Sequence, residues 1–201
     1  LIKKSKKPII IAGGGVFYSD AMEELSAFAT KHNIPVTQTV MGYSSIKKDH
    51  SHYLGTIGGL GGKAANNLSK ETDTAIAIGT KLADFTTGSW ANFENPDFKL
   101  VSINAARFDA NKHMAQAIVG DAKVSLMELS QVLGNWKADD SWHKKSKDEL
   151  KKWETYVEKE SGPTNRKLPS YAQVIGACYR NSDPTDIAVT AAGGLVGEVI
   201  Q

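Results

Sequence analysis

Residues 8–15, Pro-Ile-Ile-Ile-Ala-Gly-Gly-Gly, decide the fold of this chain. A short run that is apolar throughout and stops at consecutive glycines is typical of a buried parallel strand entering a tight turn. The next segment is expected to be a helix with Ser19 or Asp20 as its N-cap, because its apolar residues recur at spacings of three and four. Those residues are Met22, Leu25, Phe28 and Ala29.

The alternation of strands and helices continues to residue 136. Further strands are predicted at 36–40, 73–78, 99–104 and 117–120, and helices at 63–70 and 121–133. Such alternation implies parallel pairing through right-handed crossovers. We therefore predict an α/β fold, with a Rossmann-like domain over residues 1–136 whose mostly parallel sheet is flanked by helices. The closing helix offers five residues to its core face: Val124, Leu126, Met127, Leu129 and Val132.

A charged segment follows this domain. Between residues 137 and 160, seven lysines face seven acidic residues. Four apolar residues fall close to one helical stripe, which predicts an exposed helix that packs one edge against the core or another domain. They are Trp142, Leu150, Trp153 and Val157. We interpret 137–168 as a charged helical linker.

Residues 169–201 are expected to be the truncated start of a second α/β domain. A helix is predicted at 173–179, with Cys178 as a buried, inert thiol, and an apolar strand at 186–192 ends in Gly193 and Gly194. A strand, a glycine turn and a few further residues form half of a βαβ unit. The first residue is Leu1 rather than methionine. Both ends are therefore expected to be cut boundaries within a longer polypeptide.

Composition and charge exclude several classes of protein. The net charge is +2, with 24 basic and 22 acidic residues, so no global field attracts nucleic acid. The apolar run 9–12 is too short for a signal peptide or a membrane span. A single cysteine argues against a disulfide framework or a cysteine-rich metal site and fits a cytoplasmic protein. We expect neither nucleic acid nor membrane as a partner.

In an open parallel sheet, ligands bind beyond the carboxyl ends of the strands. The glycines after the first strand would let backbone N–H groups approach a phosphate. The full dinucleotide fingerprint needs a third glycine where this chain has Tyr18, and an acid ending the second strand, where it has Thr39 and Val40. An ordinary NAD-binding domain is therefore disfavoured. The candidate cleft residues are Gly13, Gly14, Gly15, Gly79, Lys81, Asp84 and Asn104.

Three other features of the sequence are possible sites. The glycine cluster at 55–62 permits either close approach of a ligand or tight backbone packing, and the two remain open. His50 and His52 resemble a metal site but lack further ligands nearby in sequence, so we interpret them as a surface loop. Ser89 lacks the flanking glycines of a nucleophile elbow. We predict no catalytic residue and no metal ligand in this chain.

Four motifs in one order carry a family resemblance: LGTIGGLGG at 54–62, GTKLADFTTGSW at 79–90, LVSIN at 100–104 and VGD at 119–121. They resemble the central domain of thiamine-diphosphate enzymes of the acetohydroxyacid synthase group. The wording of IAGGGV at 11–16, DFTTGSW at 84–90 and AAGGL at 191–195 is most similar to the trihydroxycyclohexane-1,2-dione hydrolase family of myo-inositol catabolism. That family hydrolyses a cyclic 1,2-diketone to 5-deoxy-glucuronate.

The resemblance implies a three-domain parent that uses thiamine diphosphate and Mg²⁺ and is a homo-oligomer. This chain would lack the N-terminal domain and most of the C-terminal one, so its partners would be those missing domains, and we expect the piece alone to bind no cofactor and to be inactive. Gly194, Leu195 and Val196 match residues that contact the thiamine diphosphate tail, here through backbone only. Related synthases bind FAD in the central domain. Of the residues that match their FAD contacts, this chain keeps Gly79, Lys81 and Asp84.

The FAD contacts are incomplete, however. Phe85 stands where the synthases have an arginine, and Asn104 stands near their acid. Losing a charge-assisted phosphate contact costs roughly 1.5–3 kcal/mol, so we expect a vestigial cleft without FAD. Two alternatives remain open: a piece of an acetolactate-forming or decarboxylating relative, and a free-standing dinucleotide-binding module.

Overall fold

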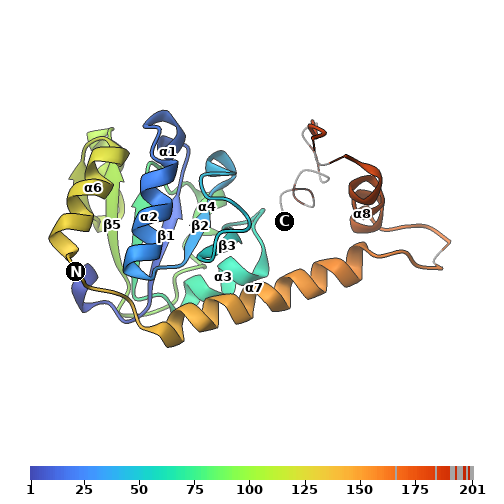
Figure 1. Cartoon of the computed structure of the whole chain (residues 1–201), viewed down its shortest axis with the longest axis horizontal. Coiled ribbons are helices and arrows are strands. Elements are labelled where there is room, and N and C mark those ends of the chain that lie inside the picture. Colours follow the sequence, from blue (N-terminus) through green and yellow to red (C-terminus); the bar gives the residue numbers. More distant parts are fainter. Residues whose placement is uncertain (166, 184, 191–192, 194–196, 198, 200–201) are drawn as a thin grey trace.

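A computed structural model describes residues 1–165, 167–183, 185–190, 193, 197 and 199 (Figure 1). Its centre is a six-stranded sheet in the order β3-β2-β1-β4-β5-β6, in which every neighbouring pair is parallel. This order confirms the predicted Rossmann-like α/β fold. The strands are β1 (Pro8–Ala12), β2 (Val36–Gln38), β3 (Tyr53–Thr56), β4 (Thr74–Ile78), β5 (Lys99–Asn104) and β6 (Gln116–Val119).

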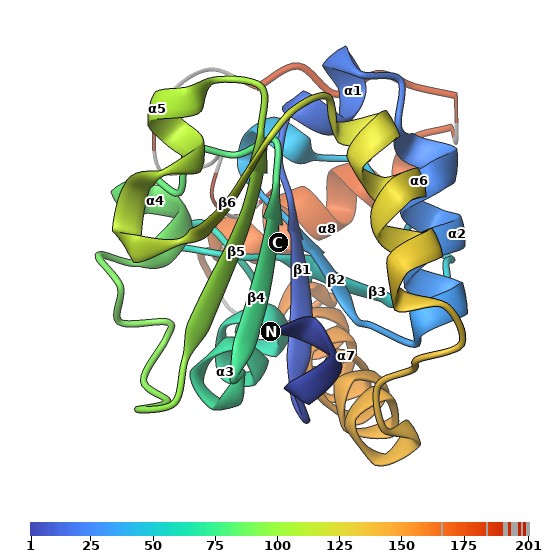
Figure 2. The same cartoon turned by 90° about the vertical axis from the view of Figure 1, so that its left-hand side faces the viewer.

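The central pair of strands is buried on both faces. Every residue of β1 and β4 is buried, and Ile10 lies opposite Ile76 in register. Helices cover both faces of such a sheet, which explains why these strands are apolar without alternation. Figure 2 shows α2 (Met22–His32) and α6 (Ala122–Leu133) together over one face, and α3 (Lys63–Glu71) and α7 (Asp140–Ser161) lie over the other.

Short helical turns occupy the connections at the two ends of the strands. The α-helical turns are α1 (Gly15–Tyr18), α4 (Asp84–Thr87) and α5 (Arg107–Ala110). The 3₁₀ turns are η1 (Ile2–Lys4), η2 (Val40–Gly42) and η3 (Lys112–Met114). Four of these turns, α1, η2, α4 and α5, come after a strand and lie at the carboxyl side of the sheet, whereas η1 and η3 come before β1 and β6.

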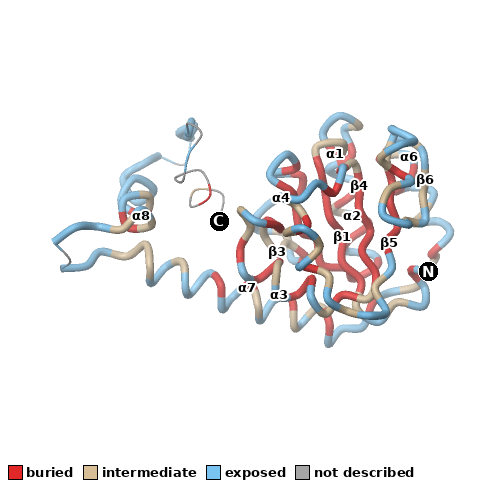
Figure 3. Tube along the Cα trace, turned by 180° about the vertical axis from the view of Figure 1, so that it is seen from behind, coloured by how far each residue is buried: buried red, intermediate tan, exposed pale blue. Residues whose placement is uncertain are grey.

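The charged segment forms the long helix α7, which runs past the sheet, and α8 (Tyr171–Asn181) packs against its far part (Figure 1). The predicted stripe is confirmed, since Trp142, Leu150 and Trp153 are buried in the core beneath the sheet. Figure 3 shows the buried residues concentrated in the sheet and its flanking helices, whereas α8 is largely exposed.

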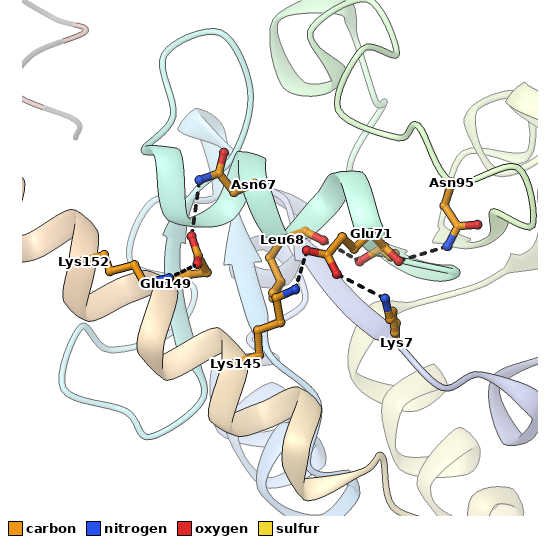
Figure 4. Close-up of polar contacts among 9 residues, drawn as sticks. Lys7, Asn67, Leu68, Glu71, Asn95, Lys145, Glu149 and Lys152 are labelled. Atoms are coloured by element: carbon orange, nitrogen blue, oxygen red, sulfur yellow. Dashed lines mark hydrogen bonds and ion pairs between the residues drawn. The ribbon is translucent and has the colours of Figure 1, made fainter.

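Polar contacts supplement the apolar stripe between α7 and α3 (Figure 4). The carboxylate of Glu71 receives both Lys7, at 3.1 Å, and Lys145. One turn further along, Glu149 accepts a hydrogen bond from the side-chain amide of Asn67 at 3.3 Å. The Nε1–H of Trp142 donates to the carbonyl of Pro8 at 2.8 Å and so ties α7 to the start of β1.

Several local predictions were wrong. Strand β3 was missed, because it has four residues and includes Gly55 at φ +95°. Asp20 is not a helix N-cap: it lies at φ 48°, and α2 begins after Ala21 without a side-chain cap. On α6, three residues expected in the core are exposed, since the buried face consists of Ala122, Ser125, Leu126 and Leu133. The exposed three are Val124, Met127 and Val132.

Of the predictions for the C-terminal part, the helix is confirmed and two others are wrong. The helix at 173–179 is present within α8, but Cys178 is exposed rather than buried, because α8 turns its buried residues Gln173 and Gly176 elsewhere. The strand expected at 186–192 is absent over 186–190, which are exposed and have no strand beside them. A strand requires a hydrogen-bonded neighbour. Among the described residues, no helix has the length and apolarity needed to cross a membrane.

Candidate functional site

The loops at the carboxyl ends of β1 and β4 are packed backbone against backbone. The N–H of Gly13 donates to the carbonyl of Ile78 at 2.8 Å, and that of Gly15 donates to Gly79 at 2.9 Å. A Cβ built on Gly15 would lie 2.5 Å from the Cα of Gly79, which itself has φ +60°. Only glycine fits such a contact. Two of the three amides in the predicted phosphate loop are therefore already committed.

The turn after β2 closes the other side of the same glycine loop. A Cβ on Gly14 would lie 3.1 Å from the carbonyl oxygen of Met41, and one on Gly42 would lie 2.3 Å from that of Ala12. The turn is held by Thr39, whose hydroxyl accepts from the N–H of Gly42 at 3.1 Å. The glycines thus bring three adjacent turns into direct contact.

The remaining cleft residues divide into committed and exposed groups. The side-chain amide of Asn104 donates to the carbonyl of Thr80 at 3.1 Å, and its oxygen accepts from the N–H of Ala106 at 2.9 Å. Lys81 and Asp84 also follow β4, but both are exposed. The structure therefore brings together Gly13, Gly14, Gly15, Gly79 and Asn104. Their polar groups do not fit a dinucleotide phosphate, because most of them already serve other loops.

The second glycine cluster is a packing feature as well. Gly58 has φ +105°, and a Cβ there would lie 2.0 Å from the carbonyl oxygen of Phe85, which also accepts from the N–H of Gly59 at 2.7 Å. The side chain of Asn66 bonds both the N–H and the carbonyl of Gly58, at 2.9 and 3.0 Å. Of the two interpretations left open by the sequence, tight backbone packing describes these loops.

A rim of exposed apolar side chains stands on these packed loops, and sequence reasoning missed it. Tyr18, Phe85 and Phe108 are 92%, 73% and 76% exposed, and Met41 is 78% exposed. They follow β1, β4, β5 and β2 respectively. Large apolar residues in glycine-rich turns after successive strands were the available signal. Each of these turns therefore presents a large apolar side chain to solvent.

A helix cap joins two of the loops at the carboxyl end of the sheet. Asp121, directly before α6, accepts from the N–H of Val124 at 3.0 Å. A hydrogen bond with the Ser19 hydroxyl, together with this cap, holds the pKa of Asp121 below its usual value. The Ser19 hydroxyl also accepts from the N–H of Ala122 at 3.3 Å. The loop after β1 is thereby tied to the loop after β6.

The histidine pair lies before β3 and not directly after the end of a strand. His50 and His52 were interpreted as a surface loop, which is wrong for His52: it is 6% exposed because α7 covers it. Over the described residues, no three or more His, Cys, Asp or Glu side chains are arranged to hold a metal ion. Gly194, Leu195 and Val196 fall outside the described residues.

Comparison with known proteins agrees with the architecture. Residues 1–129 match the family described as thiamine pyrophosphate enzyme, central domain. Three similar proteins are each named 3D-(3,5/4)-trihydroxycyclohexane-1,2-dione hydrolase. The protein of Clostridium perfringens (strain 13 / Type A) is 47% identical over 133 residues, which cover 66% of this chain and 21% of that protein. The protein of Clostridium botulinum (strain Eklund 17B / Type B) is 40% identical over 209 residues, which cover 100% of this chain and 32% of that protein.

The third, from Bacillus anthracis (strain CDC 684 / NRRL 3495), is 34% identical over 223 residues, covering 99% of this chain and 35% of that protein. The chain thus spans about a third or less of the length of these relatives. The matched segment 1–129 contains all six strands and the glycine loops that pack their carboxyl ends. The chain therefore belongs to the thiamine pyrophosphate enzyme central-domain family.

Proposed function

We propose that this chain is the central, non-catalytic part of a thiamine-diphosphate-dependent hydrolase. Its reaction would be hydrolytic C–C cleavage of a trihydroxycyclohexane-1,2-dione, which opens the ring to 5-deoxy-glucuronate in inositol catabolism. The observation that carries the proposal is the 40% identity to a hydrolase of that name along the whole chain, α7 and α8 included. The parent is proposed to be a cytoplasmic homo-oligomer.

The proposed role of the central domain is scaffold and active-site wall. Its glycine loops are filled by backbone, which supports the expectation that neither FAD nor NAD binds there. The exposed rim of Tyr18, Met41, Phe85 and Phe108 is the surface we assign to the wall. In the parent, bound thiamine diphosphate would stabilise the carbanion formed on C–C cleavage.

The cofactor is proposed to be held mainly by other parts of the polypeptide, with Mg²⁺. Residues 194–196 would contact its diphosphate through backbone groups alone. The division into a central domain (1–136), a helical linker (137–168) and the start of the diphosphate-binding domain (169–201) belongs to the same proposal. In this proposal the described residues form and support the active-site wall, and they do not hold the cofactor.

The test compares substrates on the full-length parent. With thiamine diphosphate and Mg²⁺ present, we expect ring opening of the diketone, followed as product formation, and no acetolactate from pyruvate. The reverse preference would assign the chain to an acetolactate-forming relative. The 201-residue chain alone should give no turnover under the same conditions. It should also show no thermal shift with FAD or NAD. A dinucleotide that did bind, present at 100 times its Kd, would raise the stability of the folded chain by about 2.7 kcal/mol.

A further inference from the structure

Three imidazole rings meet where α7 first touches the sheet domain. His50 and His52 lie in the loop before β3, and His143 lies in the first turn of α7. The rings of His52 and His143 are 4.2 Å apart between centroids and tilted by 31°, and those of His50 and His52 are 5.6 Å apart. Two distant segments of the chain are therefore joined by titratable groups in contact.

Hydrogen bonds fix the proton on His52. The side-chain amide of Asn33 donates to the carbonyl of Ala138 at 3.1 Å and to the carboxylate of Asp140 at 2.9 Å, so its oxygen must be the acceptor toward His52. That oxygen lies 3.1 Å from Nε2 of His52. Nδ1 of His52 is then free to accept from the hydroxyl of Ser51, at 2.9 Å. The network is complete with a neutral imidazole.

His50 is held neutral by the same logic. Its Nδ1 accepts the backbone N–H of His52 at 3.1 Å, so a proton on that atom would break the bond. Its Nε2 lies 3.3 Å from the hydroxyl of Thr30, which donates to the carbonyl of Ser26 at 2.9 Å and hence accepts from the ring. A second proton on His50 has no acceptor in this arrangement.

Burial is the main factor that opposes protonation of the three rings. Nδ1 of His143 is buried without a hydrogen-bond partner in the part of the chain that the structure describes. Burial, and then the neighbouring His143, His50 and Lys147, lower the pKa of His52 to about 4. Burial is also the main cause that lowers the pKa of His143 and of His50, against which Asp140 and Asp49 act.

We propose that His50, His52 and His143 form an acid-released latch that holds α7 against the sheet domain. Above about pH 6.5 the rings are neutral and packed together. Once α7 separates, the rings are hydrated and take up protons more readily. The imidazoles have a lower pKa when α7 is closed on the sheet domain than when it is open. The free energy that favours the closed state therefore falls as pH drops below about 6.5, and it continues to fall until pH reaches the closed-state pKa. The latch is separate from the proposed reaction.

The expected size of the effect follows from His52. A shift from 6.5 in the open state to about 4 in the closed state favours opening by about 30-fold at pH 5.0 relative to pH 7.5. Protonation of His143 and His50 adds to this factor. His32, beside Asn33 and bonded to the carbonyl of Trp136 at 2.8 Å, also has a lowered pKa because of burial. Variants must therefore separate the latch from His32.

Hydrogen exchange of the 201-residue chain at pH 7.5 and 5.0, corrected for intrinsic rates, tests the latch. We expect amides of α7 to open at least about 30-fold more often at the lower pH, while β1 and β4 stay protected. The variant His52→Gln keeps an N–H donor for Asn33 but takes up no proton, so the roughly 30-fold part of the acceleration that comes from His52 should be lost. Equal acceleration in the wild type and His52→Gln would overturn the proposal.

Two further variants serve as a stabilising variant and as a matched control. His143→Phe keeps a flat ring on His52 and removes the unpaired Nδ1, so exchange of α7 should slow at both pH values. The matched control is His113→Asn, because His113 is exposed, far from α7 in sequence, and at a positive φ that asparagine tolerates. It should keep the full acceleration. Acid-accelerated exchange in β1 and β4 as large as in α7 would mean global unfolding and would contradict a latch.

Discussion

The sheet domain and the α7–α8 arm are held by different forces. β1 and β4 bury every residue between two helical layers, so the sheet depends on continuous apolar contact. The arm is rich in charged residues, and it attaches through three buried apolar side chains, the shared carboxylate of Glu71 and the histidine cluster. α8 makes its main contacts with α7.

This difference predicts different responses to solvent. Apolar burial is nearly independent of pH and salt, whereas ion pairs are screened and imidazoles titrate. The arm should therefore loosen under conditions that leave the sheet intact. Substitutions in the two regions, ordered by their expected effect, test whether that distinction holds.

The largest loss of stability is expected from Ile10→Ala at the centre of the sheet. Ile10 is fully buried, and removing such a side chain costs about 2–5 kcal/mol. Denaturant unfolding monitored by circular dichroism measures the loss. The matched control is Val124→Ala on the exposed side of α6, expected to change stability by less than about 0.5 kcal/mol. Similar losses in both variants would place Val124 in the core after all.

An intermediate effect is expected from Trp142→Phe in the arm. The variant keeps most of the buried ring but leaves the carbonyl of Pro8 without its 2.8 Å donor, which costs about 1–3 kcal/mol. Hydrogen exchange should show the loss first in α7 and only later in β4. Uniform loss across the sheet would show that the arm and the sheet unfold together, and the comparison would fail.

The smallest effect is expected from Glu71→Gln, which removes the partner of Lys7 and Lys145. Because Glu71 is 39% exposed, we expect a loss of at most about 1 kcal/mol that shrinks in high salt. The hydrogen bond from Lys145 is the main cause that lowers the pKa of Glu71. The stability that the Glu71 carboxylate contributes is therefore fully present above pH 4.5, and it is lost as pH falls through the folded-state pKa of Glu71.

Denaturant titrations at low and high salt check this prediction. Glu94→Gln is the control, since Glu94 pairs with a single lysine, Lys70, among the described residues and its side chain is more exposed. A salt-independent loss at Glu71 larger than about 1 kcal/mol would mean that the carboxylate does more than hold two surface lysines.

Sequence reasoning predicted the elements that depend on local pattern. β1, β4 and β5 are short, largely apolar runs, and the stripe on α7 has helical spacing, so the local pattern identified them. β3 escaped because its exposure alternates around Gly55 and it forms only through pairing with β2. The apolar run at 186–190 has the composition of a strand but no partner beside it. Pairing is a non-local property.

The candidate site was predictable in position but not in state. The residues after each strand do converge at the carboxyl end of the sheet, as parallel topology requires. Whether their amides are free depends on how closely Gly15 approaches Gly79, which spacing does not reveal. The burial of His52 likewise results from a helix that begins nearly ninety residues later, at Asp140.

The contact between Gly15 and Gly79 also limits what can be grafted onto this scaffold. With a hypothetical Cβ at 2.5 Å, neither glycine can change without prising two strand ends apart. A designer who wants to open a nucleotide pocket here must lengthen a turn rather than swap side chains. Conversely, a triple-glycine signature after a first strand reports how near two turns lie, and it would persist in a protein that has never held a phosphate.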